Sequence, residues 1–352
     1  TLASPNVREL SNMTSFRVMP KHVYEGKDTV TDEEARITCG PYVLESFNKE
    51  AGTITFVVNE KYPRQPKVEK IVYQLFGNED TMYLALQQGD IDMVWAYSTG
   101  VAGTYQDVLA GDANVSLINV AAANAPAVLA FNNAKGLFTN EDLRQAVSYA
   151  LDYDAFKTYF GSAYAEIPNR GFVPATTVGY KDTEKLTTDA SKADEYMKAA
   201  GYTEKNADGF YVNADGQAAA FTLTVNAAKE THVGYAEMIK TQLEAFGIQV
   251  NLDTVDKDAY NAKTSNKFSE NNITMEAAIY GYTAAGMGMG NGLGSIYVDG
   301  SHAVQGGCQV FDEEFSAILS EMKAAKTIEE YYAGAAKLQD YYAAHMPLIA
   351  LY

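Results

Sequence analysis

The sequence has 352 residues, which at about 150 residues per domain indicates two domains. Lys and Arg number 27 against 45 Asp and Glu, and the resulting formal net charge of −18 repels phosphate backbones and anionic lipid heads. Nucleic acid is therefore not an expected partner. No apolar run approaches the ~18 residues that a membrane helix requires, and the 47% hydrophobic content is typical of a globular chain.

The first part of the chain predicts an α/β layer. Its expected elements, in order, are a hairpin over 40–59, a strand over 68–76, a helix from Asn78 or Asp80 to Gly89, a strand over 91–97, a short helix near 105–110, and apolar runs at 116–120 and 126–132 that complete the sheet. A strand, a capped helix of about ten residues and a second strand are typical of a βαβ crossover. The character changes at Asn132, where we expect a boundary.

The second part of the chain predicts another α/β lobe. Its expected elements are helices that begin at Asn140, at Asp154 and at Asp189, a strand over 220–226, a helix stopped by Gly247, strands over 248–255 and 275–280, helices over 311–326 and from Thr327, and a strand over 348–352. Residues 281–294 read GYTAAGMGMGNGLG, and these glycines follow a strand directly. Ligands of α/β sheets bind at such carboxyl ends.

Several segments, in order, resemble the extracytoplasmic solute-binding proteins of peptide, nickel and opine-type ABC importers, known as family 5. The segments that carry the resemblance are 19–27 (MPKHVYEGK), 39–47 (CGPYVLESF, where Cys39 replaces a usual glycine), 83–95 (YLALQQGDIDMVW), 129–156, 192–202, 208–216, 242–255 and 347–352 (PLIALY). Eight ordered matches are more specific than any single motif.

The resemblance implies a periplasmic-binding-protein-like (type II) two-lobe fold, of which this chain is an incomplete piece. Residues 1–36 would be a lead-in segment, 37–130 lobe I with a returning strand at 347–352, and 131–346 lobe III. It also implies that the first strand of lobe I, the small second lobe, the export signal, the lipid attachment and a C-terminal tail are absent. Because Cys39 and Cys308 would lie in different lobes, a bond between them would pin a hinge, and we expect them not to be joined.

The function that the resemblance implies is capture of a peptide-like or other small solute in an interlobe cleft by hinge closure, and delivery to an ABC permease. The protein would be extracytoplasmic, with a lipid anchor at full length. It would not be an enzyme and would need no cofactor.

Two alternatives compete with this interpretation. The first is binding of nickel or a metal chelate. The four histidines are His22, His232, His302 and His345, and no two of them are close enough in sequence to lie on one face of the same helix or strand. Each is more simply a capping or surface histidine. The second is a carboxylate-dependent hydrolase built on Asp90 with Asp92, or Asp253 with Asp256. Solvated or capping roles are commoner for such acids, and no catalytic motif occurs.

The expected ligand contacts follow the ends of two strands. They are Trp95, Tyr97, Tyr282, Thr283, Met287 and Asn291. Tyr341 and Tyr342, by contrast, are expected to be packing residues of a helix. Peptide-binding members of the family carry an aspartate in the segment that resembles 281–293, whereas this sequence has no acid there. We therefore expect a ligand other than a simple dipeptide, such as a modified peptide, a glycoside or another amphipathic solute.

Overall fold

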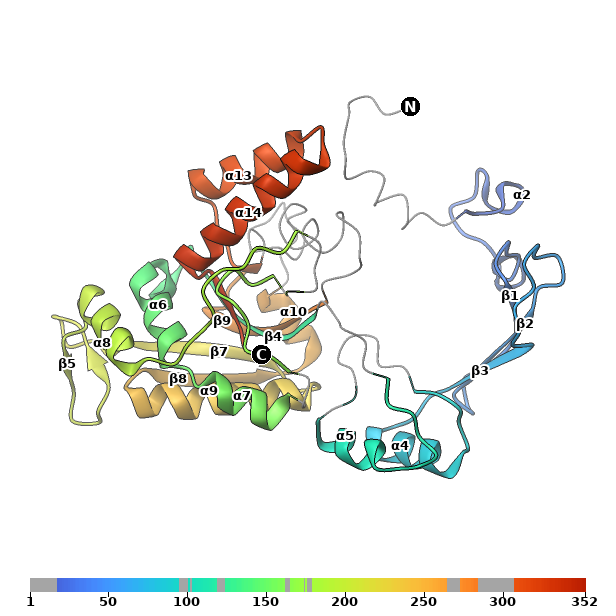
Figure 1. Cartoon of the computed structure of the whole chain (residues 1–352), viewed down its shortest axis with the longest axis horizontal. Coiled ribbons are helices and arrows are strands. Elements are labelled where there is room, and N and C mark those ends of the chain that lie inside the picture. Colours follow the sequence, from blue (N-terminus) through green and yellow to red (C-terminus); the bar gives the residue numbers. More distant parts are fainter. Residues whose placement is uncertain are drawn as a thin grey trace. The chain divides into compact units, whose positions relative to one another are not determined.

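A computed structural model describes residues 18–94, 101, 103–118, 124–161, 165–173, 175, 179–264, 273–283 and 307–352. These fall into two units (Figure 1). The large unit comprises the described residues of Ala96–Val108 and Leu117–Tyr352, and the small unit those of Met13–Trp95 and Leu109–Ser116.

The small unit contains an antiparallel meander of three strands, β1 (Tyr42–Asn48), β2 (Thr53–Val58) and β3 (Lys70–Gln74), in that order. The predicted hairpin is therefore confirmed, with Gly52 at φ 65° in its turn. Short helices α2 (Lys21–Tyr24) and α3 (Asp32–Ala35) precede it. Helix α4 (Glu79–Gln88) follows, with Asn78 as N-cap and Gly89 as left-handed C-cap, as the sequence predicts.

The βαβ crossover expected around α4 is not formed by the described residues. Residues 91–94 are bends and irregular chain, and the rest of the expected strand, 95–97, lies outside the described residues. The apolar pattern of such a short run becomes a strand only where a sheet edge offers it hydrogen-bond partners. Helix α5 (Gly103–Ala110) comes next, close to the predicted range.

The large unit is built on a five-stranded sheet with the order β10-β4-β9-β7-β8. The strands are β4 (Asn124–Phe131), β7 (Ala220–Asn226), β8 (Gln249–Val255), β9 (Ala277–Thr283) and β10 (Leu348–Ala350). Strand β7 runs parallel to β8 and β9, whereas β4 is antiparallel to both β9 and β10.

Helices cover both faces of this sheet, which makes a three-layer α/β/α unit (Figure 1). The helices and remaining strands of the large unit are η2 (Gly136–Thr139), α6 (Glu141–Ala150), α7 (Tyr153–Phe160), α8 (Ala190–Ala199), β5 (Glu204–Lys205), β6 (Tyr211–Val212), α9 (Glu230–Phe246), α10 (Lys257–Thr264), α13 (Glu313–Ala324) and α14 (Ile328–His345). Within the described part of the chain, no helix is both long and apolar enough to cross a membrane.

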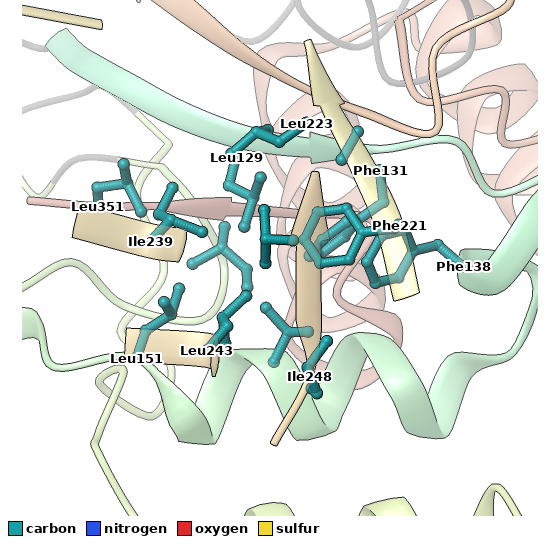
Figure 2. Packing of buried hydrophobic residues seen from close by; sticks show 14 of the residues in the cluster. Leu129, Phe131, Phe138, Leu151, Phe221, Leu223, Ile239, Leu243, Ile248 and Leu351 are labelled. Carbon is teal, nitrogen blue, oxygen red and sulfur yellow. The ribbon is translucent and has the colours of Figure 1, made fainter. Parts of the chain in front are cut away.

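The main core lies between the sheet and helices α6, α7, α8 and α9. Figure 2 shows Phe131, Phe138 and Phe221 packed beside Leu129 and Leu243, and all five are buried. A second core lies on the opposite face, where α13 and α14 pack. Since burial of an apolar side chain contributes about 1.5–3 kcal/mol, these two cores are the main source of stability of the large unit.

The closing strand differs from expectation. We expected Leu348–Leu351 to return to the lobe that contains Tyr42 to Phe56, but β10 pairs with β4 in the large sheet, so that placement is wrong. Its side chains explain why: Ile349 and Leu351 enter one core and Leu348 and Ala350 the other. A strand that is apolar on both sides requires a sheet covered on both faces.

The same pairing shows that residues 124–131 belong to the large sheet and do not complete the small one. The expected boundary between residues 130 and 131 therefore falls inside β4. Helix α7 also starts two residues earlier than expected, since its N-cap is Asp152 and not Asp154. The expected helix starts at Asn140, Asp189 and Thr327 are confirmed.

Candidate functional site

The strand directions bring one end of each strand of the large sheet to a common edge. The carboxyl ends of β7, β8, β9 and β10 meet there with the amino end of β4. In α/β sheets, ligands bind outside the carboxyl ends of the strands, because loops of variable sequence converge there. We call this the carboxyl edge, and it is the candidate site.

Two of the predicted ligand contacts end β9 at this edge. The backbone of Tyr282 pairs with Ala125 and that of Thr283 with Asn124. The side chains of Tyr282 and Thr283 are outside the described set, as are Trp95, Tyr97, Met287 and Asn291 altogether. Their contact with a ligand thus stays a prediction.

His232 lies in the first turn of α9, directly after β7 reaches the carboxyl edge. The sequence suggested a surface or capping histidine, but its side chain is buried. Burial, and to a smaller extent the nearby positive charge of Lys229, lower the pKa of His232 to about 4, so the imidazole is neutral near pH 7. A neutral ring suits its contact with Tyr235, 5.8 Å away between ring centroids.

Two tyrosines join the end of the chain to α9. The hydroxyl oxygens of Tyr235 and Tyr352 are 2.5 Å apart. Burial raises the pKa of both groups above the ordinary value, so both remain protonated and one donates to the other. This pair fixes the segment after β10 beside the carboxyl edge. No sequence motif pointed to it, because the residues are 117 positions apart.

The carboxylates considered for hydrolysis have structural partners. Asp253 accepts from Lys263 Nζ at 2.5 Å and from the Thr224 hydroxyl at 3.1 Å. Asp256 accepts the backbone N–H groups of Asp258 and Ala259, both at 2.9 Å, at the start of α10. Asp90 and Asp92 are exposed and lie on no strand. These acids therefore cap, pair or face solvent.

A pocket of about 390 Å³ lies at the opposite edge of the sheet. Its lining comes from the segment after β4 and from α6, α13 and α14, and consists of Asn133, Thr139, Glu141, Arg144, Gln309, Val310, Phe311, Asp312, Glu314, Tyr341 and His345. The polar side chains of the lining pair with one another: His345 Nδ1 lies 2.6 Å from Glu141 Oε2, and the Tyr341 hydroxyl donates to Asp312. In the described residues, no group of three or more His, Cys, Asp or Glu side chains is arranged to hold a metal ion.

Buried side chains beside this pocket satisfy the last carbonyl groups of α14. Arg144 donates to the carbonyl oxygen of His345 at 2.9 Å and to that of Phe138 at 2.8 Å. The side-chain amide of Gln145 donates to the carbonyl oxygen of Ala344, and Arg170 Nε donates to that of Ala343 at 3.4 Å. The last carbonyl groups of α14 have no partner within the helix. The helix dipole also favours cations near its C-terminus. The arrangement is structural and locks α6 to α14.

A family model for bacterial extracellular solute-binding proteins, family 5, matches residues 1–297. The chain belongs to this family. It is similar to the heme-binding protein A of Haemophilus influenzae, at 23% identity over 87% of this chain and 52% of that protein. It is also similar to the nickel-binding periplasmic protein of Escherichia coli, at 22% identity over 70% of this chain and 47% of that protein. The chain thus spans about half the length of these relatives.

Solved structures of binding proteins share the fold of this family 5 chain. The ABC transporter substrate-binding protein CtaP of Listeria monocytogenes superimposes with a TM-score of 0.77 at 20% identity, covering 100% of this chain and 68% of that chain. A periplasmic oligopeptide-binding protein of Thermotoga maritima gives a TM-score of 0.79 at 18% identity, covering 99% and 68%. The predicted family and fold class are confirmed, and the family is one of binding proteins and not of enzymes.

The two cysteines of this family 5 chain differ in environment. Both are free, with Cys39 exposed and Cys308 buried. Burial raises the pKa of the Cys308 thiol to about 12, so it is protonated and unreactive near neutral pH. Tyr341 and Tyr342 are buried in the core beneath α13 and α14, as predicted.

Proposed function

We propose that this chain is the solute-binding part of the extracytoplasmic component of an ABC importer, which captures a small solute and delivers it to a membrane permease. The observation that carries the proposal is the family match over residues 1–297, supported by the fold shared with a substrate-binding protein over the whole chain. On this proposal the full-length protein acts outside the cytoplasm, held there by a lipid anchor.

We place the solute at the carboxyl edge of the large sheet, in contact with Tyr282 and Thr283. The support is the position of their backbone at the end of β9. Trp95, Tyr97, Met287 and Asn291 complete the proposed contacts, with aromatic rings burying apolar groups and Thr283 and Asn291 offering neutral hydrogen bonds.

The proposed solute is not an ordinary free peptide. Residues 281–293 contain no Asp or Glu. A buried ammonium without a carboxylate partner keeps much of its desolvation cost, on the order of several kcal/mol. A modified peptide, a glycoside or another amphipathic solute fits better, because residues 281–293 carry no charge and methionine side chains adapt readily to the shape of a ligand.

Calorimetry of the full-length protein tests the proposal. Di- and tripeptides, their N-acetylated forms, glycosides, a nickel chelate and heme are titrated separately. We expect tight one-to-one binding without turnover by an uncharged or amphipathic solute, and weak binding of free peptides. Binding of peptides that disappears on N-acetylation would contradict the assigned ligand class, and turnover of any solute would contradict a binding function.

A pair of variants locates the site. Tyr282→Ala with Thr283→Val is expected to weaken binding of the identified solute by about tenfold or more. Asp208→Ala is the control, because Asp208 is exposed and lies between β5 and β6, a hairpin that contacts Gly247 before the amino end of β8 and so lies at the opposite edge of the sheet. If both variants bind the solute with equal affinity, the site does not lie at the carboxyl edge.

A further inference from the structure

The pocket at the far edge of the large sheet has no part in the proposed capture of a solute. Its volume of about 390 Å³ lies within the range of about 300–1,000 Å³ that is typical of sites for small molecules. Its lining comes from helices α6, α13 and α14 and from the segments that precede α6 and α13, all of which belong to the large unit. We call it the far-edge pocket, because it lies opposite the carboxyl edge.

The far-edge pocket carries a negative charge. Three carboxylates line it, and they belong to Glu141 in the first turn of α6, Asp312 at the N-cap of α13 and Glu314 in the first turn of α13. Arg144 adds one positive charge to the lining, and its Nε and Nη1 groups donate to backbone carbonyl oxygens. Whether His345 is protonated or neutral, the carboxylates outnumber the cations, so the pocket attracts positive charge and repels anions.

The side chain of His345 shows how these groups hold a flat ring. Its Nδ1 lies 2.6 Å from Glu141 Oε2, its Nε2 lies 3.7 Å from Glu314 Oε2, and its ring centroid lies 4.3 Å from that of Tyr341. The imidazole thus lies between two carboxylates and beside an aromatic ring, which are the partners that bind organic cations. The side chains of Glu141 and Glu314 are 46% and 66% exposed, so both are accessible to a second cation.

Phe311 adds an apolar surface to the lining of the pocket. Its side chain is 50% exposed and belongs to neither core of the large unit, whereas Val310 and Phe315 beside it are buried. A residue before the N-cap often packs on the fourth residue of the helix, but here that residue is Ser316, so no hydrophobic staple explains an aromatic ring at this position. An exposed aromatic ring that lines a pocket is typical of a ligand contact.

We propose that the far-edge pocket binds a small organic cation with an apolar part, such as an aromatic amidinium ion, at a site separate from the carboxyl edge. Glu141 and Glu314 pair with its charge, and Phe311 packs on its apolar part. A metal ion fits less well, because the described residues contain no group of three or more His, Cys, Asp or Glu side chains arranged to hold one. A neutral molecule gains no charge pairing with the carboxylates, and an anion is repelled by them.

Calorimetry of the full-length protein with benzamidinium and its neutral analogue benzamide tests the proposal. We expect benzamidinium to bind one-to-one with a dissociation constant below about 1 mM. Benzamide should bind at least about tenfold more weakly, because it lacks the positive charge. Equal binding of the two compounds, or no binding of benzamidinium at millimolar concentration, would overturn the proposal.

Matched variants locate the bound cation. Glu314→Gln and Phe311→Ala should each weaken the binding of benzamidinium by about threefold or more. Glu313→Gln is the control, because Glu313 shares the first turn of α13, is exposed and does not line the pocket. This control should change the affinity by less than about 1.5-fold, since solvent and salt screen its charge. Equal effects of Glu313→Gln and Glu314→Gln would place the cation outside the pocket and overturn the proposal.

Two further measurements separate the far-edge pocket from the carboxyl edge. Tyr282→Ala with Thr283→Val should leave the binding of benzamidinium unchanged, and loss of binding in that variant would place the cation at the carboxyl edge and overturn the proposal. In proton NMR, the ring signals of His345 should shift on addition of benzamidinium, whereas those of His22, an exposed residue of the small unit, should not. Ring signals of His345 that stay unshifted at saturation would also overturn the proposal.

Discussion

At the scale of single residues, His232 gives the protein a pH dependence. Its pKa is about 4 in the folded state because of burial, against about 6.5 when exposed. Below pH 6.5 the unfolded chain therefore binds more protons than the folded chain, and stability falls as pH falls. We expect His232 to account for a loss of roughly 2 kcal/mol in the free energy of unfolding between pH 7 and pH 5.

Urea unfolding at several pH values measures this loss. His232→Gln should show a smaller decrease between pH 7 and pH 5 than the unchanged chain, whereas His22→Gln, at an exposed position, should leave the decrease unaltered. If His232→Gln and the unchanged chain lose stability in parallel, His232 is accessible to protons in the folded state and its assigned burial is wrong.

Arg144 is a buried cation whose main partners are carbonyl oxygens. Replacement by Met keeps the length of the side chain but leaves the carbonyl groups of Phe138 and His345 without their donor. We expect Arg144→Met to lower the free energy of unfolding by about 3 kcal/mol. Arg64→Met, at an exposed position, should change it by about 0.5 kcal/mol or less. Chemical denaturation compares them, and equal stability of the two variants would show that Arg144 is dispensable.

At the scale of elements, the start of α14 depends on a capping box. The Thr327 hydroxyl accepts from the Glu330 N–H at 3.2 Å, and Glu330 Oε2 accepts from the Thr327 N–H at 3.3 Å. Thr327→Ala removes the first bond and should reduce stability by about 1 kcal/mol. Thr327→Ser keeps a hydroxyl and should retain most of the stability that the cap contributes. Thermal unfolding distinguishes these outcomes, and an alanine variant as stable as the serine variant would contradict the role of the cap.

At the scale of the whole molecule, the two sheets should differ in local stability. Both faces of β4 and β9 lie beneath helices in buried cores, whereas Thr55 is the only residue of β1, β2 and β3 with a buried side chain. Amide hydrogen exchange of the 352-residue chain should therefore be slowest in β4, β7 and β9, and faster by at least about tenfold in β1 and β3. Equal protection of both sheets would show that the small sheet is covered in solution.

Local signals in the sequence determined most of the elements. Asn78, Asn140, Asp189 and Thr327 begin helices because each side chain accepts a backbone N–H of its own first turn. Gly89 and Gly247 end helices because they adopt positive φ, 79° and 121°. The hairpin of β1 and β2 and the carboxyl end of β9 follow from similarly local patterns. These features depend on neighbours within a few residues, which a sequence displays directly.

Only the tertiary structure decided which strands pair and which polar groups are buried. Leu348–Ala350 reads as a buried strand, but its partner β4 lies more than 200 residues earlier. The run at 91–94 has the composition of a strand and forms none. Nothing near His232 or Arg144 in the sequence marks them as buried, because their environment comes from elements distant along the chain. Strand pairing and burial depend on many contacts between residues far apart in the sequence, whereas caps and turns depend on residues close together. For this reason the sequence determined the caps and turns, and only the tertiary structure decided the pairing and the burial.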